Sequence, residues 1–212
     1  MAIPDFPPEF RDRFVELLRW RRDVRRFRRD PLPPGQLDRL LDLACLAPSV
    51  GNSQPWRFVL VEDEVRRAAV RAVFGRCNDT AASGYDGDRA AHYRRLKLAG
   101  LQEAPVQLAV FCDQSTGQGH GLGRQTMPET LDHSAVTAIH TLWLAARIEG
   151  VGLGWVSILE PQAVAALLDV PPDWHLIGYL CLGFPESDEP VPELEREGWQ
   201  SRLGACRTVL RR

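Results

Sequence analysis

The stretch from Asp132 to Glu149 constrains the fold more than any other part of the sequence. Apolar or nearly apolar side chains, such as Ile139, Leu142 and Trp143, surround most of its helical circumference. A helix that is apolar all round is normally buried. In a chain of 212 residues this predicts one long helix, at the centre of the domain or at an interface. His140 on this helix is expected to pack in the core rather than bind a metal.

Shorter patterns on either side of this helix predict a mixture of helices and strands. Helices outnumber strands and the two do not alternate regularly, which favours an α+β sandwich over a doubly wound parallel sheet. The apolar spacing predicts helices over 8–20, from 33–34 to a point before Pro48, and over 64–74, 90–102 and 161–168. It predicts strands over 58–61, 106–112, 150–158 and 176–184.

Two segments fit neither pattern. Residues 75–89 have weak periodicity and are long for a connector, so we interpret them as a mobile lid over a site. Residues 185–212 are rich in Pro and Glu but carry Leu194, Trp199 and Leu203. We interpret them as an extended C-terminal arm whose apolar side chains need a partner surface, which a second subunit could supply. The whole chain, 1–212, is then expected to be one domain with a lid and an arm.

Composition excludes several classes of protein. The formal net charge of −2 argues against general nucleic-acid binding. The five cysteines are scattered without a CxxC pair, so neither a zinc site nor a disulfide framework is expected, and we predict no metal. There is no signal-peptide pattern and no apolar run of membrane-spanning length, which predicts a cytoplasmic protein without a membrane partner.

Arginines crowd the segment from Arg21 to Phe27, with Asp23 among them, directly after the first predicted helix. Guanidinium groups match the geometry of phosphate, and a dense cationic cluster repels itself unless an anion offsets it. The cluster therefore predicts a phosphate site for a nucleotide-like cofactor. The alternative is a solvated basic face at a helix end, where cations also suit the helix dipole.

Three glycine-containing or polar stretches could also approach a ligand. The loop 47–56 could bring backbone N–H groups close to one, or it could be an ordinary helix-to-strand connection. The glycines of 150–154 enter a strand and indicate close approach of another backbone or of a flat ligand. The run 117–123 is superficially like a dinucleotide fingerprint, but it opens no helix, so that interpretation is not favoured.

Taken together, residues from about 21 to 202 resemble the nitroreductase family of FMN-binding proteins. Within that family the chain is similar to a flavin-cleaving branch. Asp23 and Ser157 fall on the two positions that mark this branch, whereas ordinary nitroreductases often carry Ser at the Asp23 position. The matching motifs are Arg-Arg-Asp-Val-Arg (21–25), Ala-Pro-Ser-Val-Gly (47–51), Gln-Pro-Trp (54–56), Tyr-Arg-Arg-Leu-Lys-Leu (93–98), Leu-Trp-Leu-Ala-Ala-Arg (142–147), Gly-Trp-Val-Ser (154–157) and Leu-Cys-Leu-Gly-Phe (180–184).

The resemblance implies a mainly antiparallel central sheet flanked by helices, and a homodimer with FMN at the subunit interface. It further implies that reduced FMN, supplied by a separate flavin reductase, is the substrate. With O2 it would yield dimethylbenzimidazole for the lower ligand of vitamin B12, together with erythrose 4-phosphate. Two alternatives stay open: an NAD(P)H-dependent nitroreductase or flavin reductase on the same fold, and a non-catalytic flavin-binding protein.

The resemblance also assigns residue roles. Asp23 is the candidate general acid or base, or it orients the ribityl hydroxyls; the alternative is a salt bridge inside the arginine cluster. Ser157 is expected near the reacting side of the ring, or it is merely a small residue in a strand. The expected cofactor-binding residues are Arg21 and Arg25 on the phosphate, four apart on one helical face, helped by Arg22 or Arg89, with Asp23, Val24, Ser49, Gly51, Leu98, Trp155 and Ser157 along the flavin.

Overall fold

The computed structural model describes residues 4–204 and 206–212. Its centre is a sheet of four strands, β1 (Trp56–Leu60), β2 (Val106–Asp113), β3 (Gly152–Val156) and β4 (Trp174–Gly183). The strands lie in the order β1-β2-β4-β3, and every neighbouring pair is antiparallel. This confirms the predicted α+β class with a mainly antiparallel sheet.

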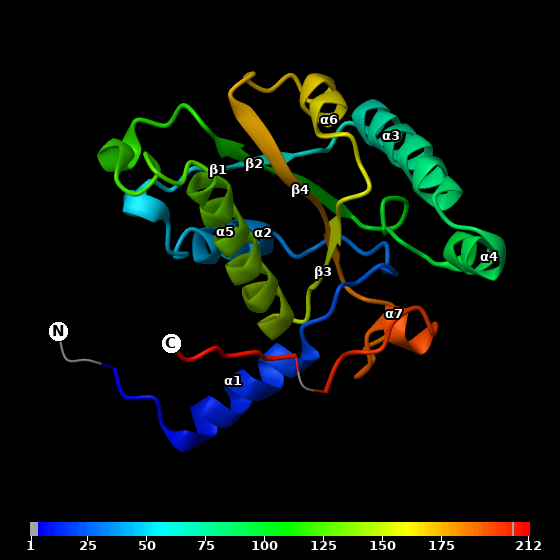
Figure 1. The fold of residues 1–212 in the computed structure, drawn as a ribbon, viewed down its shortest axis with the longest axis horizontal. Helices are drawn as coiled ribbons and strands as arrows, with labels where there is room; N and C mark the ends of the chain where they lie inside the picture. The colour runs from blue at the N-terminus through cyan, green and yellow to red at the C-terminus, as the bar shows by residue number, and fades with distance from the viewer. Residues whose placement is uncertain (1–3, 205) are drawn as a thin grey trace.

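Helices cover both faces of the sheet, as Figure 1 shows. Helices α2 (Gln36–Ala44) and α5 (Thr130–Ile148) lie on one face, and α3 (Glu64–Ser83) and α6 (Pro161–Leu167) lie on the other. Alternate residues of a strand point to opposite faces. In β2, Leu108 and Val110 therefore join the α5 side, whereas Ala109 and Phe111 join the α3 side.

The long helix α5 is buried on one side only. Ile139 and Leu142 are inaccessible to solvent, but Val136 is 40% exposed and Ile148 is 72% exposed. His140 is exposed, so the prediction that it packs in the core is wrong. The helix packs centrally over one face of the sheet, and its expected place at an interface stays a prediction.

The lid segment is mostly helical. The predicted helix ending at Phe74 is wrong, because α3 continues to Ser83 and only a short connector separates it from α4 (Gly87–Arg95). The second half of α3 is largely exposed and therefore lacks the apolar period that marks a buried helix. The helix predicted over 90–102 is also too long, since Gly100 lies in a loop closely packed against the Phe27 ring. Mobility of 75–89 stays a prediction.

The two ends of the chain form peripheral elements. Helix α1 (Pro8–Trp20) has no buried residue and lies beside the C-terminal end of α5 in Figure 1. The arm contains one short helix, α7 (Glu193–Arg196). Residues 1–3 of the expected domain and Ala205 of the arm lie outside the described residues. None of the helices described is both long and apolar enough to cross a membrane.

Candidate flavin site

The arginine-rich segment is extended rather than helical. Helix α1 ends at Trp20, and the backbone N–H of Val24 then donates to the carbonyl of Leu153 at 3.0 Å, so that the segment lies along β3. The glycines of β3 make this approach possible: a Cβ atom on Gly154 would lie 2.1 Å from the Val24 carbonyl oxygen. Of the two interpretations of these glycines, close approach of another backbone is the one observed.

Asp23 uses one carboxylate oxygen to bind β3 and the other to bind Arg25 of its own segment. Its Oδ1 accepts a hydrogen bond from the Trp155 backbone N–H at 2.9 Å, and its Oδ2 accepts one from Arg25 Nε at 2.8 Å. The Arg25 side chain is only 12% exposed and also donates through Nη1 to the Lys97 carbonyl at 3.1 Å. The salt bridge considered as the alternative role of Asp23 is therefore present, and Arg25 is largely committed to other protein groups.

Arg21 is the arginine that remains available. Its guanidinium lies 4.5 Å from the centre of the Trp143 ring, and within the described residues its side chain makes no hydrogen bond or ion pair. Burial lowers the pKa of Arg21, Asp23 opposes this shift, and Arg202 adds to it. The prediction that Arg21 and Arg25 share a helical face is wrong, because the segment is extended after Trp20.

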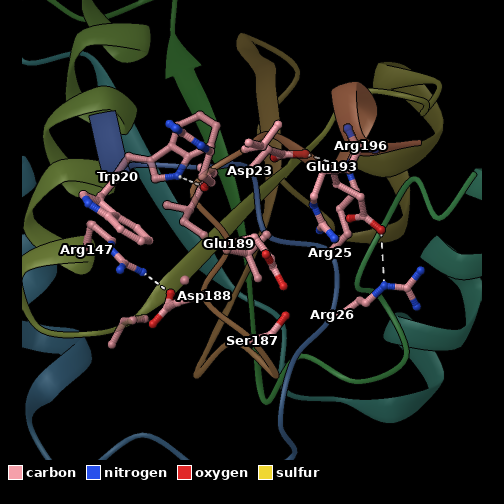
Figure 2. Close-up of a pocket in the computed structure, with 17 residues that line it drawn as sticks. Trp20, Asp23, Arg25, Arg26, Arg147, Ser187, Asp188, Glu189, Glu193 and Arg196 are labelled. Atoms are coloured by element: carbon pink, nitrogen blue, oxygen red, sulfur yellow. Dashed lines mark hydrogen bonds and ion pairs between the residues drawn. The ribbon is translucent and has the colours of Figure 1, made fainter. Parts of the chain in front are cut away.

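Arg22 and Arg26 are bound by the C-terminal arm instead, and Figure 2 shows the pair that Arg26 makes with Glu193. Arg22 Nη2 donates to the Pro190 carbonyl at 2.6 Å, and Arg26 Nε pairs with Glu193 at 3.2 Å. Burial lowers the pKa of Arg22, and the positive charges of Arg202, Arg21 and Arg147 lower it further, with Glu195 opposing them. The arm thus covers one side of the arginine cluster.

The cleft between the arm and the cluster is small. It measures about 60 Å³ and is lined by Arg22, Asp23, Val24 and Arg25 together with arm residues. Cofactor sites usually measure roughly 300–1,000 Å³, so a flavin ring does not fit there. Trp143 also lines this cleft, and its ring centre lies 6.3 Å from that of Trp155.

Ser49 and Gly51 are not brought to the arginines within one chain. Their loop is attached to the first turns of α5, where the Val50 N–H donates to Ser134 Oγ at 3.0 Å, whereas Trp143 lies more than two turns further along. Ser49 Oγ accepts a hydrogen bond from the Gln54 N–H at 3.1 Å. A Cβ on Gly51 would lie 3.0 Å from the Leu122 carbonyl, so this glycine admits a neighbouring loop.

The remaining predicted site residues are Ser157, Leu98 and Arg89, and they lie on three different segments. Ser157 is exposed directly after β3, two residues beyond Trp155. Leu98 is half-buried next to Lys97, whose carbonyl binds Arg25. Arg89 is exposed on α4 and stacks on Trp199 of the arm at 5.0 Å.

Sequence reasoning assigned no role to two side chains of α5 beside the motif. Trp143 contacts Arg21, and its Nε1 donates to the Arg22 carbonyl at 3.0 Å. Arg147, four residues later, pairs with Asp188 of the arm. The four-residue spacing of Trp143 and Arg147 on one helix face was an available signal. Trp199 packs beside Tyr85, His92 and Tyr93 of its own chain, so this apolar side chain of the arm needs no second subunit.

The antiparallel sheet, the central helix and the arginine segment along β3 are features of one family of flavoproteins. The model of the nitroreductase family matches residues 18–184, and the chain belongs to this family. Among curated proteins, it is 59% identical over 199 residues to a protein from Rhodospirillum rubrum named 5,6-dimethylbenzimidazole synthase, with 94% of each chain covered. A Rhodobacter capsulatus protein of the same name is 50% identical, covering 94% of this chain and 96% of its own.

The fold has relatives among solved structures. An iodotyrosine deiodinase bound to FMN and 3-iodo-L-tyrosine is 28% identical, with a TM-score of 0.71, covering 92% of this chain and 99% of its own. A BluB-like flavoprotein from Clostridium difficile is 21% identical, with a TM-score of 0.66, covering 85% of this chain and 93% of its own; at that identity it supports the fold alone.

Proposed function

We propose that this protein catalyses the O2-dependent fragmentation of reduced FMN to 5,6-dimethylbenzimidazole and erythrose 4-phosphate, for the lower ligand of vitamin B12. The observation that carries this proposal is the near-full-length identity of 59% and 50% to two proteins named 5,6-dimethylbenzimidazole synthase. Asp23 and Ser157 are the residues that mark the flavin-cleaving branch. Asp23 binds the backbone N–H of Trp155, and Ser157 lies two residues after Trp155.

The residues fit a flavin whose phosphate is held by Arg21. FMN, when bound, supplies the redox chemistry and the carbon atoms of the product, which no side chain can replace. Arg21 offers a charged donor fork that is in no ion pair among the described residues. Asp23 fixes the Trp155 backbone and Arg25, and an ionised carboxylate keeps acceptor capacity beyond those two hydrogen bonds. That remaining capacity can orient a ribityl hydroxyl or take up a proton.

A homodimer would complete the site. Within one chain, Ser49 and Gly51 lie apart from Arg21, and the cleft at the arginines is too small for a flavin. The exposed apolar sides of α1 and α5 offer a surface for a second copy. In this proposal the partner supplies the loop 47–51 to the flavin, a separate flavin reductase supplies reduced FMN, and the protein acts in the cytoplasm.

The deciding experiment is single turnover with reduced FMN. The protein is mixed with externally reduced FMN and air, and dimethylbenzimidazole is sought by mass and absorbance. Formation of that product is expected. Rapid NAD(P)H oxidation without it would instead identify an NAD(P)H-dependent reductase.

Two substitutions test the assignment of the site. Asp23→Asn and Ser157→Gly are expected to keep FMN bound, as measured by flavin fluorescence, and to lose at least about tenfold in product formation, within the usual range for a proton-transfer group. Wild-type rates in both variants would show that these residues do not take part. Loss of the product together with loss of bound FMN would show that they only shape the binding site.

A further inference from the structure

A second cationic cavity lies away from the flavin motif. It measures about 530 Å³ and sits between the first half of α3 and the loop that precedes β2. Its charged lining comprises Arg29, Arg67, Arg71, Glu64 and Glu103, and none of these residues lines the cleft at the arginine motif. The volume falls in the range of small-molecule sites, which is roughly 300–1,000 Å³.

Arg67 is held in place by neutral groups. Its Nε donates to the Val61 carbonyl at 2.7 Å and its Nη2 donates to the Pro105 carbonyl at 3.0 Å. Among the described residues it has no carboxylate partner within ion-pair distance. Its position is therefore fixed while its positive charge stays uncompensated, which is a preorganised arrangement for an anion.

The neighbouring charges do not cancel this excess. Arg71 pairs with Glu64 at 2.5 Å, but Glu64 is 71% exposed, so water screens that charge. Glu103 is paired with Lys97 at 2.7 Å. Arg29 makes no ion pair within the described part of the chain. Three arginines and two glutamates give the lining a net charge of +1, and Arg29 and Arg67 are its two arginines without an ion pair among the described residues.

We propose that this cavity binds a small phosphate monoester. The two unpaired arginines, Arg29 and Arg67, can both donate to one phosphate group, since guanidinium forks donate in pairs to phosphate oxygens. The cavity is larger than a bare phosphate ion, which leaves room for an organic group of a few carbon atoms. The site is separate from the proposed flavin reaction and does not depend on it.

The test is a calorimetric titration with glycerol 1-phosphate at constant ionic strength, with succinate as a dicarboxylate of equal charge. Arg29→Gln and Arg71→Gln are each expected to weaken binding of the phosphate ester about tenfold. Arg66→Gln is the matched control, because Arg66 lies on the same helix but pairs with Asp169 and the Leu167 carbonyl. Arg67 is left unchanged, since it also supports the backbone.

The same titration in Arg21→Gln separates this cavity from the flavin site. Binding that persists there, weakens in Arg29→Gln and Arg71→Gln and is unchanged in Arg66→Gln supports the proposal. The proposal is overturned by the absence of saturable binding, by loss of binding in Arg21→Gln, by equal weakening in Arg66→Gln, or by succinate binding as tightly as the phosphate ester.

Discussion

At the scale of single residues, Gly154 determines whether the arginine segment can lie along β3. We expect Gly154→Ala to cost about 3 kcal/mol of unfolding free energy, because its Cβ would stand 2.1 Å from a backbone oxygen of Val24 that cannot rotate away. Urea denaturation measures this. Gly75→Ala is the control: no atom lies within 4 Å of its Cβ, and removing glycine from helix α3 should stabilise by about 0.5–1 kcal/mol. Equal stability of the two variants would contradict the packing described.

Arg21 and Arg25 are expected to differ although both belong to the same motif. Arg21→Ala removes a charged donor from the phosphate, which should weaken FMN binding by about ten- to a hundredfold and leave riboflavin binding nearly unchanged. Arg25→Ala removes the partner of Asp23 and should weaken both ligands alike. Fluorescence titration with FMN and riboflavin gives the two ratios. A similar loss for both ligands in Arg21→Ala would mean that Arg21 does not hold the phosphate.

The chemistry of this motif was predictable from sequence, but its backbone conformation was not. The density of arginine around Asp23 indicates an anion site by residue type alone. The prediction that residues 21–25 are helical was wrong. Val24 of this segment binds Leu153, about 130 positions away, and local spacing in the sequence carries no information about such a partner. The alternating glycines of 150–154 did carry such information, because they indicated that another backbone could approach this strand closely.

At the scale of elements, an ion pair joins the ends of β1 and β2. Arg57 Nη2 lies 2.7 Å from Asp113 Oδ2, and the Asp113 side chain is 12% exposed. Burial alone would raise the pKa of Asp113, but the hydrogen bonds from Ser115 and the charge of Arg57 together lower it below its ordinary value. A carboxyl whose pKa is lowered by folding stabilises the fold above its unfolded pKa, and this contribution is lost as the pH falls through the folded pKa.

Asp113→Asn should therefore be less stable than wild type by about 1–3 kcal/mol at pH 7. The difference should shrink below about pH 4, where the wild-type carboxyl begins to take up a proton. Urea denaturation at pH 7 and at pH 3 measures it. A difference that is the same at both values would mean that the charge of Asp113 is not what stabilises this end of the sheet.

The element boundaries show where local patterns stop being informative. The four strands were predicted within a few residues because each is a short apolar run between polar turns. The ends of α3 and α4 were not, because exposed helical turns need no apolar period. Trp199 illustrates the same limit: the sequence shows that it needs a partner, but only the fold places Tyr85 and Tyr93 beside it.

At the scale of the whole molecule, α1 is an amphipathic helix with no buried residue. Phe10, Phe14 and Leu18 lie four residues apart and are 52%, 44% and 40% exposed. Residues four apart share a helix face. A contiguous apolar stripe of this kind on a protein surface marks an interaction site, and in the proposed dimer a second copy covers it.

Phe14→Asp places a charge in the middle of this stripe and should convert the dimer to a monomer in sedimentation equilibrium. Its affinity for FMN should fall with the dimer, because the partner would no longer present Ser49 and Gly51. Val65→Asp is the matched control, since Val65 is 76% exposed on α3, on the opposite face of the sheet. A Phe14→Asp chain that stays dimeric would place the interface elsewhere. A monomer that binds FMN as tightly as wild type would show that one chain holds the flavin without residues from a partner.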